Sequence, residues 1–189
     1  MEEKKRNIDR RLEQKIGFDQ IRRIISDRCS TTYAVERTAT ETFSTNQAHI
    51  RKRLLLTDEM RLIMMFEDGF PSGGFIDCID FLKPLERSSS AIDLLSLRKL
   101  KTMLETLRKV TSFFEGIKDG VYPNLKRMSS RILNFPEIQR RIDGILDRYG
   151  DVKDTASDEL YSIRKSLREK EGTISRRMTA ILKKAQEEG

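Results

Sequence analysis

Few side chains in this sequence are of the types that perform acid–base or nucleophilic chemistry. His49 is the only histidine, and no serine or cysteine lies at a spacing from it that indicates a catalytic pair. Cys29 and Cys78 are the only cysteines, and they lack the C-x-x-C spacing of a zinc or redox site. We therefore expect buried, reduced thiols, no catalytic residue and no metal site in this chain.

Acidic pairs and a glycine-rich segment are two further candidates. The acidic pairs are Asp58 with Glu59, Asp77 with Asp80, and Asp143 with Asp147. Each could hold a metal only with ligands that the sequence does not supply, so we interpret them as solvent-facing or capping residues in helix-surface salt bridges. The segment Phe70–Gly74 contains Pro71 and two glycines, but no Gly-Lys-Ser/Thr follows it and no strand precedes it. It predicts a turn between two helices.

Positive charge is the most distinctive chemical feature. The chain has 189 residues, with 37 Lys and Arg against 30 Asp and Glu, giving a net charge of +7. Between residues 161 and 185, eight basic side chains face only two acids, which accounts for nearly all of that surplus. This composition suits a helix that presents charge to a polyanion such as a nucleic-acid backbone. The alternative is a solvated coiled-coil surface, because no aromatic side chain is interleaved for base stacking.

The spacing of apolar residues indicates which elements carry these side chains. Apolar positions recur at helical spacing almost everywhere, so the sequence predicts an all-α fold, a helical bundle with a long C-terminal helix that projects as a coiled-coil-like arm. We expect a helical domain over residues 1–150, then a turn and one helix over 151–189. The longest apolar run, Leu62–Phe66, is far too short to cross a bilayer. We expect no membrane association and a cytoplasmic protein.

Local signals predict several helix boundaries. Ser44 with Gln47 resembles a capping box, Pro136 suits a first helical position, and Ser157 is a good N-cap for the last helix. A central helix of about 25 residues is expected to run from Ile92 to Phe114.

The last helix carries a narrow apolar seam. Its residues are Leu160, Ile163, Leu167, Ile174, Met178 and Ile181. Such a stripe is typical of one face of a coiled coil. A seam residue is missing near Lys170 and Glu171, and Gly172 beside them is expected to weaken or kink the helix there.

Four segments of the chain resemble the N-terminal region of the MutS family, most closely its second bacterial branch, MutS-two. They are Glu13–Ile21, Thr57–Met60, Ile142–Asp147 and Gly150–Ser157. The chain departs from that branch where Asp158 follows Ser157, a place where a proline is common. The resemblance implies that residues 1–150 form the core or lever segment and that 151–189 begin the DNA clamp. It also implies a fragment of a longer, homodimeric ATPase that binds branched DNA and suppresses recombination.

The resemblance further assigns partners and sites. ATP, Mg and an endonuclease domain would belong to the parent protein, while this chain would hold no cofactor, take no small-molecule substrate and catalyse nothing. The partner would be branched or duplex DNA, or a collided ribosome. Phosphate contacts would come from Arg164, Lys165, Arg168, Arg176, Arg177, Lys183 and Lys184. The alternative hypothesis is a helical scaffold that dimerises through the seam without binding nucleic acid.

Overall fold

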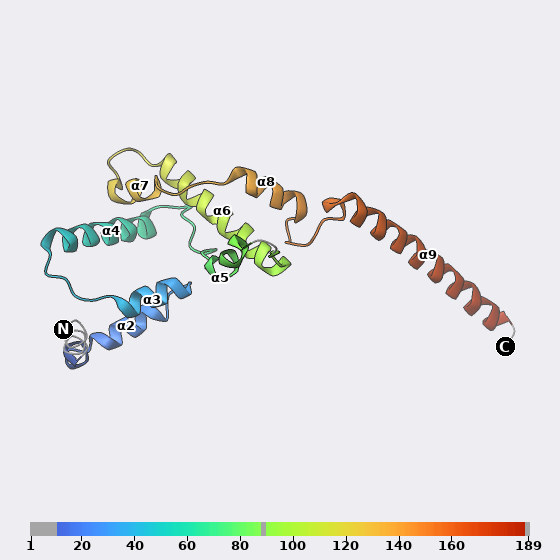
Figure 1. The fold of residues 1–189 in the computed structure, drawn as a ribbon, viewed down its shortest axis with the longest axis horizontal. Helices are drawn as coiled ribbons and strands as arrows, with labels where there is room; N and C mark the ends of the chain where they lie inside the picture. The colour runs from blue at the N-terminus through green and yellow to red at the C-terminus, as the bar shows by residue number, and fades with distance from the viewer. Residues whose placement is uncertain (1–10, 88–89, 188–189) are drawn as a thin grey trace. The chain divides into compact units, whose positions relative to one another are not determined.

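The computed structural model describes residues 11–87 and 90–187, and every regular element within them is helical (Figure 1). The all-α prediction is confirmed. The elements are α2 (Phe18–Ser26), α3 (Thr32–Thr40), α4 (Gln47–Phe66), α5 (Ile79–Leu82), η1 (Lys83–Glu86), α6 (Leu94–Gly116), α7 (Pro123–Ser129), α8 (Pro136–Ile145), η2 (Asp154–Ala156) and α9 (Asp158–Glu187). None of the helices in the described ranges is long and apolar enough to cross a membrane.

The chain divides into two compact units, one ending at Phe135 and one beginning at Pro136. In the second unit α8 and α9 both contact η2, so packing groups α8 with the last helix. The expected functional division after residue 150 stays a prediction, because a packing unit and a functional segment need not share a boundary.

The core of the first unit lies where α4, α6 and α7 meet. Its buried residues are Ile63, Val110, Phe114, Tyr122 and Leu125. They come from three helices that are separated in sequence, and their burial supplies the main apolar stabilisation of this unit. The long expected helix is confirmed as α6, which the side chain of Asp93 caps by accepting a hydrogen bond from the Ser96 amide at 2.9 Å.

The glycine-containing segment packs on α6 and is part of an irregular connection between α4 and α5. The Phe70 ring packs edge-on against Phe113, with ring centroids 5.2 Å apart. Gly74 has φ +83°, and a Cβ added to it would lie 2.3 Å from Oγ1 of Thr106, a buried residue of α6. The predicted connection between helices is confirmed, and the close approach of its backbone to α6 explains why one position requires glycine.

Two sequence interpretations are wrong in detail. Helix α4 is capped by Asn46, whose side chain accepts from the His49 amide at 3.0 Å, whereas the Ser44 hydroxyl accepts from Asn46 in the preceding turn. Glu59 is not in a helix-surface salt bridge but is buried, with 7% of its surface exposed. Its carboxylate binds the start of α7, which no local pattern in α4 indicates.

Glu59 accepts three hydrogen bonds from α7. The Asn124 amide and side-chain nitrogen donate to Oε1 at 3.1 and 2.6 Å, and the Leu125 amide donates to Oε2 at 2.7 Å. The first turn of a helix has free amides, and α7 receives no side-chain cap from its own N-cap residue, Tyr122. Glu59 therefore caps α7 from α4 and fastens the two helices together.

Candidate nucleic-acid interface

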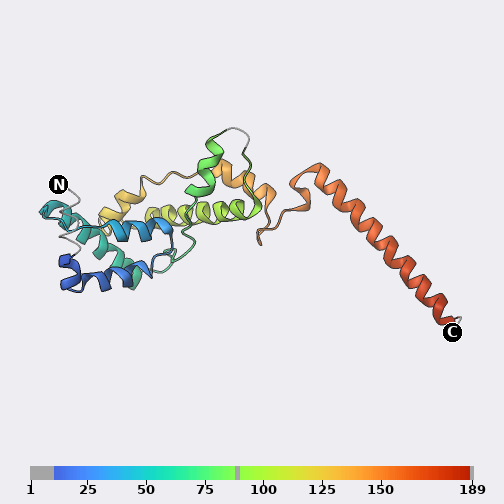
Figure 2. The same cartoon turned by 60° about the horizontal axis from the view of Figure 1, so that its bottom comes forward.

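All thirteen candidate binding and pairing residues lie on α9. The Ser157 hydroxyl accepts a hydrogen bond from the Leu160 amide at 3.1 Å, which confirms the predicted N-cap. The helix has 30 residues and is unbroken at Gly172, so the expected weak point does not interrupt it (Figure 2). A helix of this length spans about 45 Å.

The turn between α8 and α9 is held by the carboxylate of Asp147. Its Oδ1 accepts hydrogen bonds from the amides of Tyr149 and Asp151, at 2.8 and 2.9 Å. Gly150 completes the turn with φ +85°, a conformation that side chains with a Cβ rarely adopt. The turn predicted before the last helix thus has a defined hydrogen-bonded structure.

A short backbone ladder joins the two sides of this turn. Leu146 and Val152 form an antiparallel bridge, and the Lys153 amide donates to the Ile145 carbonyl at 2.8 Å. The Lys153 ammonium also donates to the Asp143 carbonyl at 2.6 Å. The end of α8 and the approach to α9 are consequently tied along several residues, and we call this segment, residues 145–157, the corner.

Asp154 connects the corner to the first turns of α9. Its Oδ1 accepts from Arg164 Nη1 at 2.5 Å, its Oδ2 pairs with Arg168, and Arg164 also donates to the Val152 carbonyl at 2.9 Å. These arginine hydrogen bonds hold the pKa of the Asp154 carboxyl below its usual value. Two of the seven predicted phosphate-contacting residues therefore already have an intramolecular carboxylate partner.

The other five predicted contacts are exposed and make no ion pair with any residue in the described ranges. They are Lys165, Arg176, Arg177, Lys183 and Lys184. Arg176 makes only local bonds, donating from Nε to the Gly172 carbonyl at 3.2 Å and approaching Thr173 Oγ1 at 3.5 Å. Their charges are available to an anionic partner.

The apolar seam of α9 is exposed as well. Ile163, Leu167, Ile174, Met178 and Ile181 are each between 54 and 62% exposed, and Leu160 is half-buried. Burying such side chains against another apolar surface is favourable by roughly 25 cal/mol per Å². The structure thus leaves on α9 an apolar stripe that a partner helix could cover.

Seam and cations occupy different sides of the helix. Lys165 and Lys183 each lie nine residues from Ile174, which is about two and a half turns, so both point away from the seam. Arg176 lies within about 20° of the same opposite direction, at about 100° per residue. These three cations form what we call the back face of α9, with Arg177 and Lys184 nearer the seam.

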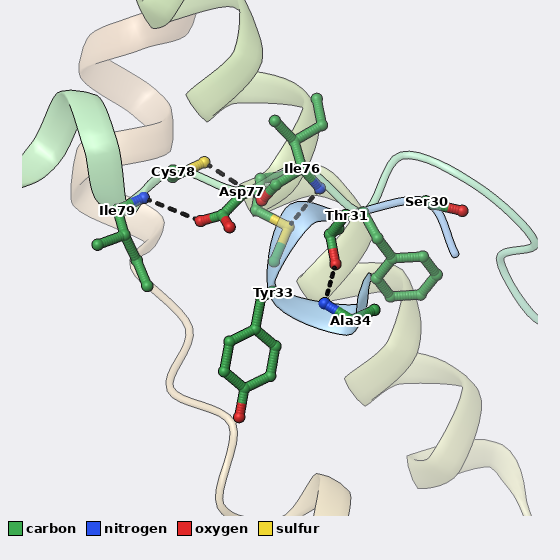
Figure 3. Close-up of a pocket in the computed structure, with 10 residues that line it drawn as sticks. Ser30, Thr31, Tyr33, Ala34, Ile76, Asp77, Cys78 and Ile79 are labelled. Carbon is green, nitrogen blue, oxygen red and sulfur yellow. Dashed lines mark hydrogen bonds between the residues drawn. The ribbon is translucent and has the colours of Figure 1, made fainter. Parts of the chain in front are cut away.

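A separate hollow lies in the first unit, between the start of α3, the segment leading into α5, and α6 (Figure 3). Its volume is about 600 Å³, and Tyr33, Phe75, Ile76, Cys78 and Met103 are among its lining residues. Burial, with the nearby Asp77 charge, raises the pKa of the Cys78 thiol, so the thiol is kept protonated. The hollow therefore lacks an activated nucleophile at Cys78.

Nothing in the described part of the chain groups three or more His, Cys, Asp and Glu side chains into a potential metal site. His49 is exposed on α4, and Cys29 and Cys78 are free and half-buried rather than fully buried. The residues that the sequence could not reveal as important are Glu59 and Asp154, whose partners lie on other elements. The only available signal for Asp154 was that Arg164 and Arg168 share one side of α9 near its start.

The chain is similar to proteins named endonuclease MutS2. It is 26% identical over 177 residues to that of Thermomicrobium roseum, 23% over 171 residues to that of Alkaliphilus oremlandii, and 25% over 178 residues to that of Listeria welshimeri. These matches cover 90 to 93% of this chain but 22% of each relative, so the chain spans about a fifth of their length. No protein-family model matches. The similarities support a MutS2-like family for the chain, as its motifs indicated.

Proposed function

We propose that this MutS2-like chain is a non-catalytic lever and clamp segment that binds DNA through α9. The observation that carries the proposal is the back face, where Lys165, Arg176 and Lys183 are exposed, make no ion pair with the described residues, and point away from the seam. Each such cation can neutralise a phosphate and release a counterion. The contact would therefore be electrostatic and independent of base sequence.

The spacing along α9 suits a duplex backbone. Lys165 and Lys183 are about 27 Å apart along the helix at 1.5 Å per residue, with Arg176 between them. DNA carries one charge per about 1.7 Å of axis, so several phosphates fall within that length. Branched DNA is the proposed partner because its arms offer backbones in more than one direction. Ribosomal RNA carries the same phosphate groups and is distinguished by competition.

The corner supports the lever part of the proposal. Backbone hydrogen bonds join the last turn of α8 to the corner, between Ile145 and Lys153. The hydrogen bond from Arg164 to Asp154 joins the corner to the first turns of α9. A joint held by bonds at both ends transmits rotation from one helix to the other more faithfully than an open linker. A shift of α8 would accordingly reorient the back face.

The proposal assigns no catalytic step to these residues. The word endonuclease belongs to the names of the relatives, of which the chain matches about 22% of the length. We propose that ATP and Mg binding, and any nuclease chemistry, are functions of the whole MutS2-like protein and not of α2–α9. Suppression of recombination and action on collided ribosomes are likewise proposed for the whole MutS2-like protein and not for these helices.

Salt-dependent binding tests the proposal. Fluorescence anisotropy with a labelled four-way junction and a linear duplex would be recorded between about 50 and 200 mM salt. Substituting Lys165, Arg176 and Lys183 by Gln is expected to reduce the slope of log K against log salt by about 2.7, because each lost phosphate contact removes about 0.9. Competition with unlabelled ribosomal RNA would identify the preferred polymer.

A matched control removes the same charge elsewhere. Lys15, Lys52 and Lys118 are exposed residues of the first unit, and their triple substitution by Gln also lowers the net charge by three. The control is expected to keep most of the wild-type slope. An equal loss in both variants, or an unchanged slope in the α9 variant, would reject α9 as the contacting element.

A further inference from the structure

The carboxylate of Asp154 neutralises a cation that borders the back face of α9. Arg168 lies three residues after Lys165 and about 60° around the helix from it, so the two side chains are neighbours on the helix surface. Among the described residues, Asp154 is the only hydrogen-bond partner of the Arg168 guanidinium. Without this carboxylate, the positive charge of the back face would extend toward the corner.

A phosphate group can compete with Asp154 for the same guanidinium. Carboxylate and phosphate oxygens both bind the fork of N–H donors that arginine presents. We propose that Asp154 is an internal competitor of phosphate, and that the backbone of bound DNA displaces it from Arg168. This inference rests on the proposed function, because it concerns the regulation of the same helix. It assigns to Asp154 a role beyond holding the corner.

The two arginines bound by Asp154 differ in how readily they are released. Arg164 has a second acceptor, the Val152 carbonyl at 2.9 Å, and its side chain is 36% exposed. Arg168 has only the carboxylate among the described residues, and its side chain is 62% exposed. Ion pairs that water reaches are weak, because solvent screens the charges and the side chains lose entropy on pairing. Exchange with phosphate is therefore assigned to Arg168, while Arg164 stays at the corner.

The exchange couples DNA binding to the corner. Oδ1 of Asp154 binds Arg164 and Oδ2 binds Arg168, so the release of Arg168 removes one of the bonds between the corner and α9. A movement of the corner that withdrew Asp154 would in turn free the charge of Arg168 for DNA. Coupling between two binding equilibria is reciprocal, so each event favours the other. The corner thereby controls how many cations α9 presents.

An NMR titration with sodium polyphosphate tests the exchange without DNA. The Nε–H signal of Arg168 in the full chain is expected to shift as polyphosphate is added. Asp154→Asn, which keeps the shape but removes the charge, should lower the concentration at half of the shift about two- to fivefold, the factor that an exposed ion pair contributes. An Arg168 signal that does not respond to polyphosphate would overturn the proposal.

Glu159→Gln is the matched control. It removes one negative charge from the first turn of α9, where Glu159 is exposed and makes no ion pair with any residue in the described ranges. The control is expected to leave the half-point of the titration nearly unchanged, and circular dichroism verifies that both variants keep their helices. Equal changes in the two variants would attribute the effect to net charge and would overturn the proposal.

Salt-dependent anisotropy with the labelled four-way junction tests the consequence for DNA. Asp154→Asn is expected to tighten binding by the same factor and to steepen the slope of log K against log salt by up to about 0.9, which corresponds to one phosphate contact. Adding Arg168→Gln should remove this gain. A gain that persists without Arg168, or one no larger than that of Glu159→Gln, would overturn the proposal.

The two sets of variants separate this inference from the proposed function. If the salt slope depends on Lys165, Arg176 and Lys183 but Asp154→Asn has no effect, only the inference fails. If substitution of those three cations has no effect on the slope, the proposed function fails. The polyphosphate titration then still decides whether phosphate displaces Asp154 from Arg168.

Discussion

The capping of α7 by Glu59 gives a quantitative test of how the first unit is held together. Replacing Glu59 by Ala removes the acceptor of three hydrogen bonds, from the Asn124 amide, the Asn124 side chain and the Leu125 amide. Pro123 precedes them at the start of α7 and has no amide hydrogen to donate. The two amides are therefore the first free donors of this helix, and the substitution leaves both without an acceptor.

The expected loss follows from the burial of this carboxylate. Hydrogen bonds to a charged group contribute about 1.5 to 3 kcal/mol each, and they are not additive when they share one acceptor. Because only 7% of Glu59 is exposed, water replaces these bonds poorly. We expect Glu59→Ala to lower the unfolding free energy by about 3 to 4 kcal/mol. Glu59→Gln, which keeps the shape but turns a donor toward an amide, should cost about 2 kcal/mol.

Urea unfolding followed by circular dichroism, together with hydrogen exchange at the Asn124 and Leu125 amides, measures this loss. The control is Asp58→Ala, one residue earlier on α4, where an exposed carboxylate pairs with Arg61 at 2.8 Å. Such surface pairs contribute no more than about 1 kcal/mol. If Glu59→Ala changed stability no more than Asp58→Ala, or left exchange at the two amides unchanged, the capping argument would be refuted.

Two further perturbations test local geometry. Gly74→Ala should destabilise the first unit by about 2 to 4 kcal/mol, because the added Cβ would meet Thr106 Oγ1 and the φ of residue 74 is positive. The control Gly73→Ala has open space around it and should change the stability measured by urea unfolding little. Because its two arginine partners hold the pKa of Asp154 below normal, the carboxylate should stabilise the corner fully above about pH 4 and lose this effect as pH falls through the lower folded-state pKa. An NMR titration of the Asp154 carboxyl with a midpoint at or above about 4 would contradict its ion pairs with Arg164 and Arg168.

Features with short-range causes were predictable from the sequence. The last helix begins after Ser157, α8 begins at Pro136, and the connection at Phe70–Gly74 separates two helices, as expected. Each signal depends on residues within one turn of the boundary, where side-chain caps and proline geometry act directly. The wrong prediction of the α4 cap also depends on local residues. Ser44 and Asn46 are both of the types that cap helices, but of the two only the Asn46 side chain accepts a hydrogen bond from a first-turn amide, that of His49.

Contacts between distant segments were not predictable. Glu59 meets α7 across 65 residues of sequence, and neither its spacing nor its neighbours distinguish it from Asp58. Gly74 is similarly constrained by Thr106, which lies on another element. Helical periodicity reports which face of a helix is apolar, but it does not report which polar side chain on that helix receives a buried partner.

Two of the segments that resemble the MutS-two branch, Ile142–Asp147 and Gly150–Ser157, now have a physical explanation. Asp147, Gly150 and Asp154 hold the corner, the first two by shaping the turn and the third by binding Arg164 and Arg168. The carboxylates of Asp147 and Asp154 therefore bind groups of this same chain, and these bonds fix the geometry of the joint.

This use of charge divides the roles of α9. Asp154 pairs with Arg164 and Arg168, whereas in the proposed function the back-face cations Lys165, Arg176 and Lys183 contact phosphate. Because the back face and the seam lie about half a turn apart, a partner helix that covered the seam would leave Lys165, Arg176 and Lys183 exposed. The seam and the proposed DNA-binding face can therefore be used at the same time on one helix.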